Sequence, residues 1–124
     1  MIICDTNILI HAFNGDSRTI ETLQSIGYEN IALSSVTVME LYQGMANKQE
    51  LAQMKKKIKY FDIIQIDTIS SKLAISLVEK YRLSNGLAIP DALIAASAIV
   101  VQLELFTYNL KDFSFIPDLK LFKV

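Results

Sequence analysis

The stretch MIICDTNIL, residues 1–9, decides how the rest of the chain is interpreted. Its first four residues are apolar, and one carboxylate, Asp5, follows them. From Thr6 onward apolar residues recur at helical spacing. We therefore expect a buried strand that runs directly into a helix, with Asp5 at the joint. In open α/β sheets such joints bind ligands, although Asp-Thr-Asn at residues 5–7 is equally suited to an ordinary helix N-cap.

The composition is typical of a globular protein with one hydrophobic core. The 124 residues suit a single domain, residues 1–124, and 52% of them are apolar while 20% are charged. The longest apolar stretch, residues 92–101, is too short to cross a bilayer, and the start shows no basic segment followed by a cleavage site. We therefore expect a cytoplasmic protein without a secretory signal or a membrane partner.

The charged residues and the cysteine content narrow the function classes. A single cysteine, Cys4, excludes an internal disulfide framework and a cysteine-based zinc site. The formal net charge of −1 argues against a protein that coats nucleic acids generally, because such proteins are usually basic. This charge does not exclude an enzyme that meets phosphate groups through a bound metal ion.

Strand and helix signals alternate along most of the chain. After the opening strand we expect strands at residues 31–33, 63–66 and 105–108, a loop over 109–117, and a possible edge strand at 119–124. Helices are expected in the intervals: a short one after Asp5, one ending at Gly27, one at 36–46, one that follows a break at Asn47 and continues through Phe61, and two at 70–83 and 92–103. The last of these is apolar on nearly all sides and is expected to be buried against the sheet centre. This alternation predicts a three-layer α/β/α sandwich with a central, mostly parallel sheet of four to five strands.

Polar side chains occupy the positions where this layout places strand ends and helix starts. They are Asp5, Glu40, Asp91 and Asn109, with Asp112 close behind. In a parallel sheet these positions share the carboxyl edge. Several carboxylates gathered there would repel one another and favour a proton or a cation, and oxygen ligands without His or Cys suit Mg²⁺ or Mn²⁺. The chemistry that this supports is hydrolysis of a phosphodiester.

Each of these residues also has a structural explanation. Residues 37–40 match a capping box, in which Glu40 would only bond back to the helix start. Asp91 after Pro90 is a common first-turn acid, and Asn109 is a common turn residue. The coincidence of several such residues at one sheet edge favours the chemical interpretation.

Four sequence blocks point to a known family. They are ICDTNIL (3–9), SSVTVMEL (34–41), IPDALIAA (89–96) and TYNLKDF (107–113). In their order and spacing the sequence resembles the PIN-domain ribonucleases, and more narrowly the VapC-type toxins of bacterial and archaeal toxin–antitoxin pairs. The blocks span nearly the whole chain and are specific together, whereas the opening Asp-Thr-Asn alone would be weak. The fold of that family is the three-layer sandwich expected above.

The resemblance implies an Mg²⁺- or Mn²⁺-dependent endoribonuclease that uses a metal-activated water and acts as the toxin of a type II toxin–antitoxin system. Asp5, Glu40 and Asp91 match the acidic metal-binding positions of the family. Asn109 stands where the family often has a fourth acid, so Asp112 is a candidate for the missing carboxylate, through a water molecule. The presence of Asn109 instead of an acid weakens the expectation of a second bound metal ion more than that of the first.

The resemblance also implies supporting residues and partners. Thr107 and Asn7 match polar positions that orient the acids by hydrogen bonds. Lysines are candidates for RNA phosphate contacts, although a solvated helix face explains them equally well; they are Lys55, Lys56 and Lys59. In the family this region shapes a dimer cleft and receives the antitoxin, so Met45 and Met54 are candidates for facing a partner rather than the core. The implied partners are RNA, a cognate antitoxin, a second copy in a homodimer, and DNA only through the antitoxin.

Two other functions compete with this interpretation. A phosphoacceptor receiver domain would use Asp67 at the end of the third strand, but it would require adjacent acids after the first strand and would give Glu40 and Asp91 no role. A catalytically silent PIN-like module would only bind RNA or protein, and Asn109 is compatible with that. The only histidine, His11, is expected to be structural rather than a general base.

Overall fold

Four short parallel strands form the central sheet in the computed structural model, which describes residues 1–124. The strand order is β3-β2-β1-β4, and every neighbouring pair is parallel. The strands are β1 (Ile2–Cys4), β2 (Ile31–Ser34), β3 (Asp62–Ile64) and β4 (Glu104–Phe106). The chain adds strands first on one side of β1 and then on the other. The order therefore reverses at β1, and the carboxyl ends of β1 and β4 flank the crevice where such sheets bind ligands.

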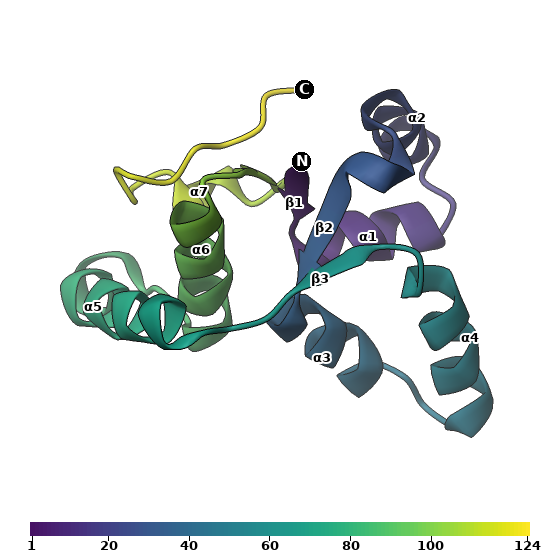
Figure 1. Ribbon diagram of the computed structural model, residues 1–124, viewed down its shortest axis with the longest axis horizontal. Coiled ribbons are helices and arrows are strands. Elements are labelled where there is room, and N and C mark those ends of the chain that lie inside the picture. Colours follow the sequence, from purple (N-terminus) through teal and green to yellow (C-terminus); the bar gives the residue numbers. More distant parts are fainter.

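Helices cover both faces of this sheet, as the alternating sequence pattern predicts. They are α1 (Thr6–Phe13), α2 (Ser17–Ile26), α3 (Ser35–Gln43), α4 (Lys48–Ile58), α5 (Thr68–Asn85), α6 (Ile89–Val101) and the short α7 (Leu110–Phe113), with one 3₁₀ turn, η1 (Tyr28–Asn30). Figure 1 shows α5 and α6 on one side of the strands and α1, α2 and α4 on the other. The predicted three-layer α/β/α sandwich with a parallel sheet is confirmed. No helix is both long enough and apolar enough to cross a membrane.

Two buried clusters hold the layers together, because successive strand residues point to opposite faces. Ile3 and Leu105 belong to the cluster under α5 and α6. Their neighbours Cys4 and Phe106 belong to the cluster under α1, α2 and α4. All four side chains are completely buried. The strands are therefore apolar throughout, which is the pattern of a sheet covered on both faces.

The helix starts follow from local capping chemistry. The side chains of Asp5, Asp16, Ser34, Asn47 and Asp67 each accept a hydrogen bond from a backbone amide at the start of the helix that follows. These caps place five of the helices immediately after turns or strand ends. Because β1 passes to α1, and β2 to α3, without a connecting loop, the first turns of α1 and α3 lie at the carboxyl edge of the sheet.

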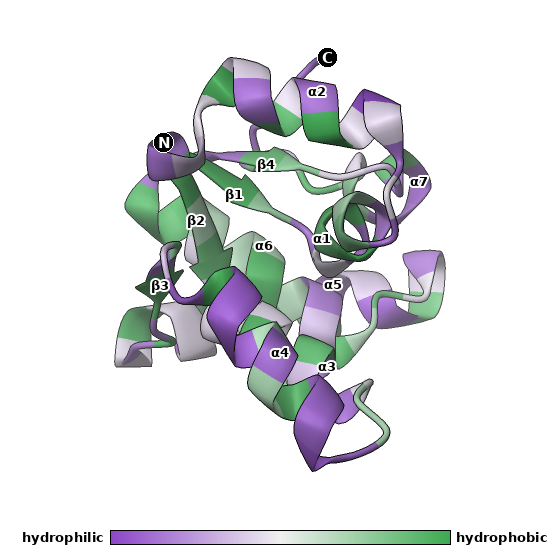
Figure 2. Cartoon of the chain, turned by 90° about the vertical axis from the view of Figure 1, so that its right-hand side faces the viewer, coloured by the Kyte–Doolittle hydropathy of each residue, from purple (hydrophilic) through white to green (hydrophobic).

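Helix α6 is the most buried helix, as its composition predicts. It begins at Ile89, with Pro90 in its first turn, and residues 94–98 are all buried. Its alanines allow close packing, and α5 is its main neighbour. Figure 2 shows α6 coloured as hydrophobic behind the sheet, whereas the outer face of α4 is strongly hydrophilic.

Three local expectations differ from the structure. Residues 109–117 are not entirely a loop, because α7 lies within them and inserts Phe113, 1% exposed, into the core. The expected edge strand at 119–124 is reduced to a single parallel bridge between Leu105 and Leu121. The third and fourth strands end two residues earlier than expected, because the chain leaves the sheet at Ile64 and Phe106.

Candidate active site

A polar cleft of about 310 Å³ opens at the carboxyl edge of the sheet. Five of the residues predicted from the sequence line it together: Asp5, Glu40, Asp91 and Asn109, and the supporting residue Asn7. The remaining lining residues are Thr6, Ile10, Gln43 and Gly44. No lysine, arginine or histidine lines the cleft, so its carboxylates have no basic partner there.

Asp5 serves as a helix cap and as a cleft residue at the same time. Its Oδ1 accepts a 2.8 Å hydrogen bond from the backbone amide of Thr6, which caps α1. Its Oδ2 accepts a 2.8 Å hydrogen bond from the hydroxyl of Thr107, which follows β4. The side chain is only 4% exposed. A helix cap and a ligand site at residues 5–7 are therefore compatible, since Oδ1 of Asp5 caps the helix while its Oδ2 faces the site.

Glu40 lies one turn farther along α3 than the sequence suggests. The helix begins at Ser35, and its cap is Ser34, whose hydroxyl accepts a 3.2 Å hydrogen bond from the amide of Val36. Glu40 is thus in the second turn, and the capping-box explanation is wrong. Its Oε1 instead accepts a 2.7 Å hydrogen bond from the hydroxyl of Thr6, directly beside Asp5.

Thr6 and Thr37 join the first two helix starts, and neither was singled out as a site residue from the sequence. Their hydroxyl oxygens lie 3.1 Å apart, and both side chains are buried. The signal that could have found them is a threonine within each of the first two acidic blocks, one residue after Asp5 and three before Glu40. Together they hold the carboxylate of Glu40 toward that of Asp5.

Asp91 lies in the first turn of α6, as predicted, and is partly buried. Burial raises its pKa to about 6, and the negative charges of Asp5, Asp112 and Glu40 add to this effect. Burial also raises the pKa of Asp5, although the hydrogen bonds from Thr107 and Thr6 oppose that rise. The cleft therefore concentrates negative charge that nothing in the chain neutralises.

The donor set of this cleft fits a hard divalent cation. All of its charged ligand atoms are carboxylate oxygens, and Asn109 adds an amide oxygen, which are the ligands that Mg²⁺ prefers. No three acidic side chains converge on one point. Mg²⁺ is commonly held by one or two carboxylates and keeps several of its waters, so two acids together with water are sufficient to bind it.

The remaining predicted residues surround this cleft in different ways. The hydroxyl of Thr107 accepts a 3.0 Å hydrogen bond from the amide of Asn109, which stabilises the turn after β4. Asp112 is exposed on α7 and does not line the cleft, yet its charge raises the pKa of both Asp5 and Asp91. Asn7 lines the cleft but makes no hydrogen bond to an acid, so the expectation that it orients them is not met in this structure.

The lysines lie outside the cleft, Lys55 and Lys56 on α4 and Lys59 directly after it. Lys55, Lys56 and Lys59 are all exposed, with Lys59 placing its Nζ 5.1 Å from the ring centre of Tyr60. Lys57 lies 5.3 Å from the ring centre of Phe13 on α1. These lysines therefore form a solvated basic face at α4 and its C-terminal end.

A groove of about 440 Å³ runs from the cleft between α1, α3 and α4. It shares Ile10, Glu40 and Gly44 with the cleft, so the two hollows are continuous. Met45 and Met54 both line it. However, Met54 is only 6% exposed and belongs to the core, so the expectation that it faces a partner instead of the core is wrong. Its position on the inner face of α4, packed toward the sheet, explains the difference.

Two other residues considered from the sequence lie apart from the acids. His11 is exposed on α1, and its ring packs edge-on against Tyr108 at 5.3 Å. Asp67 caps α5 by accepting a 2.7 Å hydrogen bond from the amide of Ser70, which lowers its pKa. Neither residue lines the cleft, so neither is placed to act on a group bound there.

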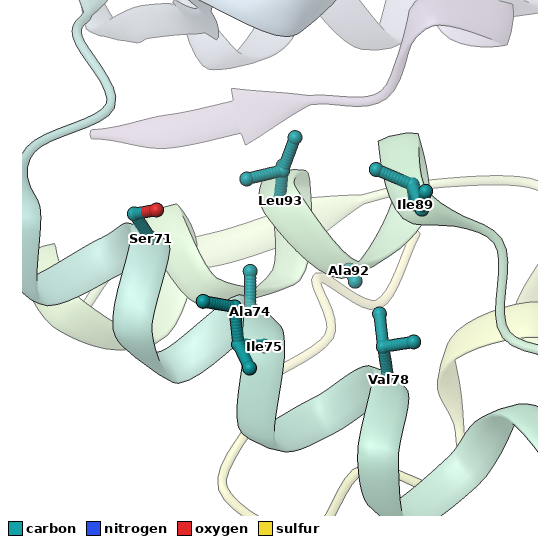
Figure 3. A pocket seen from close by; sticks show the side chains of 7 residues that line it. All are labelled: Ser71, Ala74, Ile75, Val78, Ile89, Ala92 and Leu93. Atoms are coloured by element: carbon teal, nitrogen blue, oxygen red, sulfur yellow. The ribbon is translucent and has the colours of Figure 1, made fainter.

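An apolar pocket of about 260 Å³ lies between α5 and α6. Figure 3 shows Ala74, Ile75 and Val78 of α5 facing the start of α6. Ile75 and Ile89 are each 66% exposed. Large apolar side chains gathered on a surface are typical of protein contacts.

Comparisons with known proteins agree with this architecture. A model of the PIN domain family matches residues 2–117. Ribonuclease VapC19 of Mycobacterium tuberculosis is 31% identical over 126 residues, covering 97% of this chain and 98% of that protein. Ribonuclease VapC2 of Rickettsia felis is 33% identical over 122 residues, covering 93% and 91%.

Solved structures of similar proteins extend the agreement to the whole fold. A chain of VapBC2 from Rickettsia felis, bound to a DNA fragment from its promoter, matches with a TM-score of 0.81 and 30% identity over 98% of both chains. A chain of a toxin–antitoxin complex from Klebsiella pneumoniae matches with a TM-score of 0.81 and 30% identity over the full length of both.

Proposed function

This chain belongs to the PIN domain family, and from that premise we propose that it is a divalent-metal-dependent endoribonuclease that acts as the toxin of a toxin–antitoxin pair. The relatives named as ribonucleases and the toxin–antitoxin complexes among the similar structures support this. The observation that carries the proposal is the cleft itself. Asp5, Glu40 and Asp91, from three separate elements, line one hollow without any basic partner.

Asp5, Glu40 and Asp91 would hold the cation between them, directly or through its water molecules, with Asn109 available through its amide oxygen. When bound, Mg²⁺ or Mn²⁺ would supply an activated water and neutralise charge on the attacked phosphate. The chain's own contribution is orientation. Thr107 and Thr6 each donate a hydrogen bond to one of these acids, so the carboxylates are held in place before any substrate arrives.

Lys55, Lys56 and Lys59 are proposed to contact the RNA backbone. They are exposed on α4 and at its C-terminal end, on the same side of the sheet as α1, which lines the cleft. Contacts of this kind hold an RNA strand without reading its sequence. Sequence preference would then depend on the cleft and the surfaces around it.

The groove between α1, α3 and α4 is proposed to receive a segment of the antitoxin. Its lining mixes apolar residues with Glu50 and Lys57, which suits a peptide with both apolar and charged side chains. Since it continues into the cleft at Glu40, a segment lying in it would block access to the acids. This provides a direct route for inhibition by a partner protein.

The apolar pocket between α5 and α6 is proposed as the contact with a second copy of the chain (Figure 3). Ile75 and Ile89 would become buried there. The check is the mass in solution by sedimentation, at several concentrations, for the parent and for Ile75→Lys. A parent that is monomeric throughout would contradict the homodimer.

The experiment that tests the function is RNA cleavage by antitoxin-free protein, with Mg²⁺ or Mn²⁺ and with EDTA. Asp5→Asn and Asp91→Asn should abolish cleavage, whereas the matched surface variant Asp118→Asn should retain it. Binding of Mn²⁺ should weaken in the first two variants only. If the parent binds RNA but does not cut it under any condition, the silent binding module is the better description, and Asn109 is the first residue to examine.

A further inference from the structure

Tyr108 lies between two residues of the cleft region, Thr107 and Asn109, but its side chain points away from the acids. Its ring packs edge-on against Phe106, at 5.5 Å between ring centres, and against His11 at 5.3 Å. Tyr108 nevertheless remains 38% exposed. Apolar burial alone therefore does not explain how this side chain is held.

The hydroxyl of Tyr108 begins a chain of hydrogen bonds that leads to the start of α2. It lies 2.6 Å from the hydroxyl oxygen of Thr19, a side chain that is completely buried. Thr19 in turn donates its hydroxyl proton to the carboxylate of Asp16. A threonine hydroxyl has only one proton, so Tyr108 must be the donor to Thr19. The order of donation is thus Tyr108 to Thr19 to Asp16.

Asp16, at the end of this series of hydrogen bonds, has a second role. Its carboxylate also accepts a 3.3 Å hydrogen bond from the backbone amide of Thr19, which caps α2. The hydrogen bond from the Thr19 hydroxyl lowers the pKa of Asp16, so its carboxylate stays ionised as an acceptor. The anchor at the start of α2 is therefore complete without any contribution from the cleft.

Resting on the proposed nuclease function, we propose that Tyr108 is a positioning residue: it fastens the turn at residues 107–109 to α2 through Thr19, and so holds the Thr107 hydroxyl against Asp5. Neighbouring side chains of an extended segment point to opposite sides. Phe106 and Tyr108 contact each other on one side, and Thr107 between them bonds to Asp5, so fixing Tyr108 toward α2 holds Thr107 toward that acid. The turn has left β4 and has no strand partner of its own, which is why it needs such an anchor.

A double-mutant cycle tests this on the full chain. Tyr108→Phe keeps the ring and removes the donor, while Thr19→Val keeps the buried volume and removes the acceptor. Each should lower kcat for RNA cleavage roughly 10-fold, the lower end of the range for residues that support metal ligands, with KM unchanged. The double variant should be no worse than either single variant, because both remove the same connection. Tyr28→Phe, at a comparably exposed tyrosine without a bonded hydroxyl, is the control.

A second readout does not depend on cleavage. The amide of Asn109 donates to the Thr107 hydroxyl, so its hydrogen exchange in metal-free protein reports the order of the turn. Exchange should accelerate in both single variants and not in Tyr28→Phe. This would support the positioning role even if the parent cut no RNA and the proposed function failed. Unchanged exchange of the Asn109 amide, an unchanged kcat, or additive losses in the double variant would each overturn the positioning role. A rise in KM alone would also overturn it, because it would show that Tyr108 touches RNA instead.

Discussion

The hydroxyl of Thr107 donates a 2.8 Å hydrogen bond to Oδ2 of Asp5, joining the ends of β4 and β1 across a separation of 102 residues. This contact lowers the pKa of Asp5, in opposition to the effect of burial. Together with the hydrogen bond from the Thr6 amide, it limits the rise in the pKa of this nearly buried carboxyl group. Several expectations about the site rest on it and on the cap formed by the same side chain.

Thr107→Val should lower kcat for RNA cleavage by roughly 10- to 100-fold, since it removes a hydrogen bond to the ionised form of a metal-binding acid. The affinity for Mn²⁺ should fall in parallel. Thr107→Ser retains the hydroxyl and is the matched control, with activity near that of the parent. Cleavage by Thr107→Val as fast as that by Thr107→Ser would contradict a role for this hydrogen bond.

Asp5→Asn and Asp5→Ala should separate the two roles of this residue. Both should lose cleavage, because both remove the charge. The asparagine oxygen still accepts from the amide of Thr6, so only Asp5→Ala loses the cap of α1, which costs about 1 kcal/mol of unfolding free energy. Urea denaturation of the metal-free proteins measures this difference. If the two variants are equally stable, the cap contributes nothing to stability.

Metal-free protein should become less stable as the pH rises from about 4 to above 6. The folded pKa of Asp91, about 6, lies above its ordinary value of 3.8. In that interval the folded protein therefore binds more protons than the unfolded chain, and the unfolding free energy falls with rising pH. Allowing for partial solvent exposure, the loss is about 1 kcal/mol.

Asp91→Asn should flatten this dependence, and saturating Mg²⁺ should offset it by neutralising the acids. Thermal unfolding between pH 4 and pH 8, with and without Mg²⁺, makes the comparison. A parent and an Asp91→Asn variant with the same pH profile would rule out Asp91 as the source of the effect.

Replacing Lys55, Lys56 and Lys59 together by Gln should raise KM for RNA without changing kcat. If these lysines contact phosphates, each lost contact should reduce the slope of log affinity against log salt by about 0.7, the value for single strands. The matched control replaces Lys72 and Lys80, exposed lysines of α5, and should leave the slope unchanged. A salt slope that is identical in all three proteins would show that the α4 lysines form only a solvated face.

The fold was predictable because its signals are local. An apolar run followed by Asp5 and a change of period marks the joint of β1 and α1, and a similar joint recurs between β2 and α3. Helix α7 was missed because four residues are too few to show a period. The C-terminal segment alternates like a strand, yet only Leu121 pairs with β4, since apolar residues on both sides of it pack into the core instead.

The site was predictable only in part, because its geometry depends on the strand order. Residues 34–40 offer two chemically valid helix caps, Ser34 and Thr37, and the sequence does not choose between them. In the structure Ser34 is the cap, so Glu40 accepts a hydrogen bond from Thr6, 34 residues away in the sequence. Pairings such as Thr6 with Glu40, or Tyr108 with Thr19, leave no periodic pattern, since they form only after β1 lies between β2 and β4.

Asn109→Asp should add the fourth acid that the family often has at this position. An additional negative charge in the cleft should raise the pKa of Asp91 further above 6 in the metal-free protein. It should also strengthen binding of a second divalent cation, because an ionised oxygen replaces a neutral one. Counting Mn²⁺ ions bound per chain in the parent and the variant, with Asn85→Asp as the surface control, measures this directly. An unchanged count with cleavage intact would mean that Asp112, whose charge already reaches both Asp5 and Asp91, supplies that position in the parent.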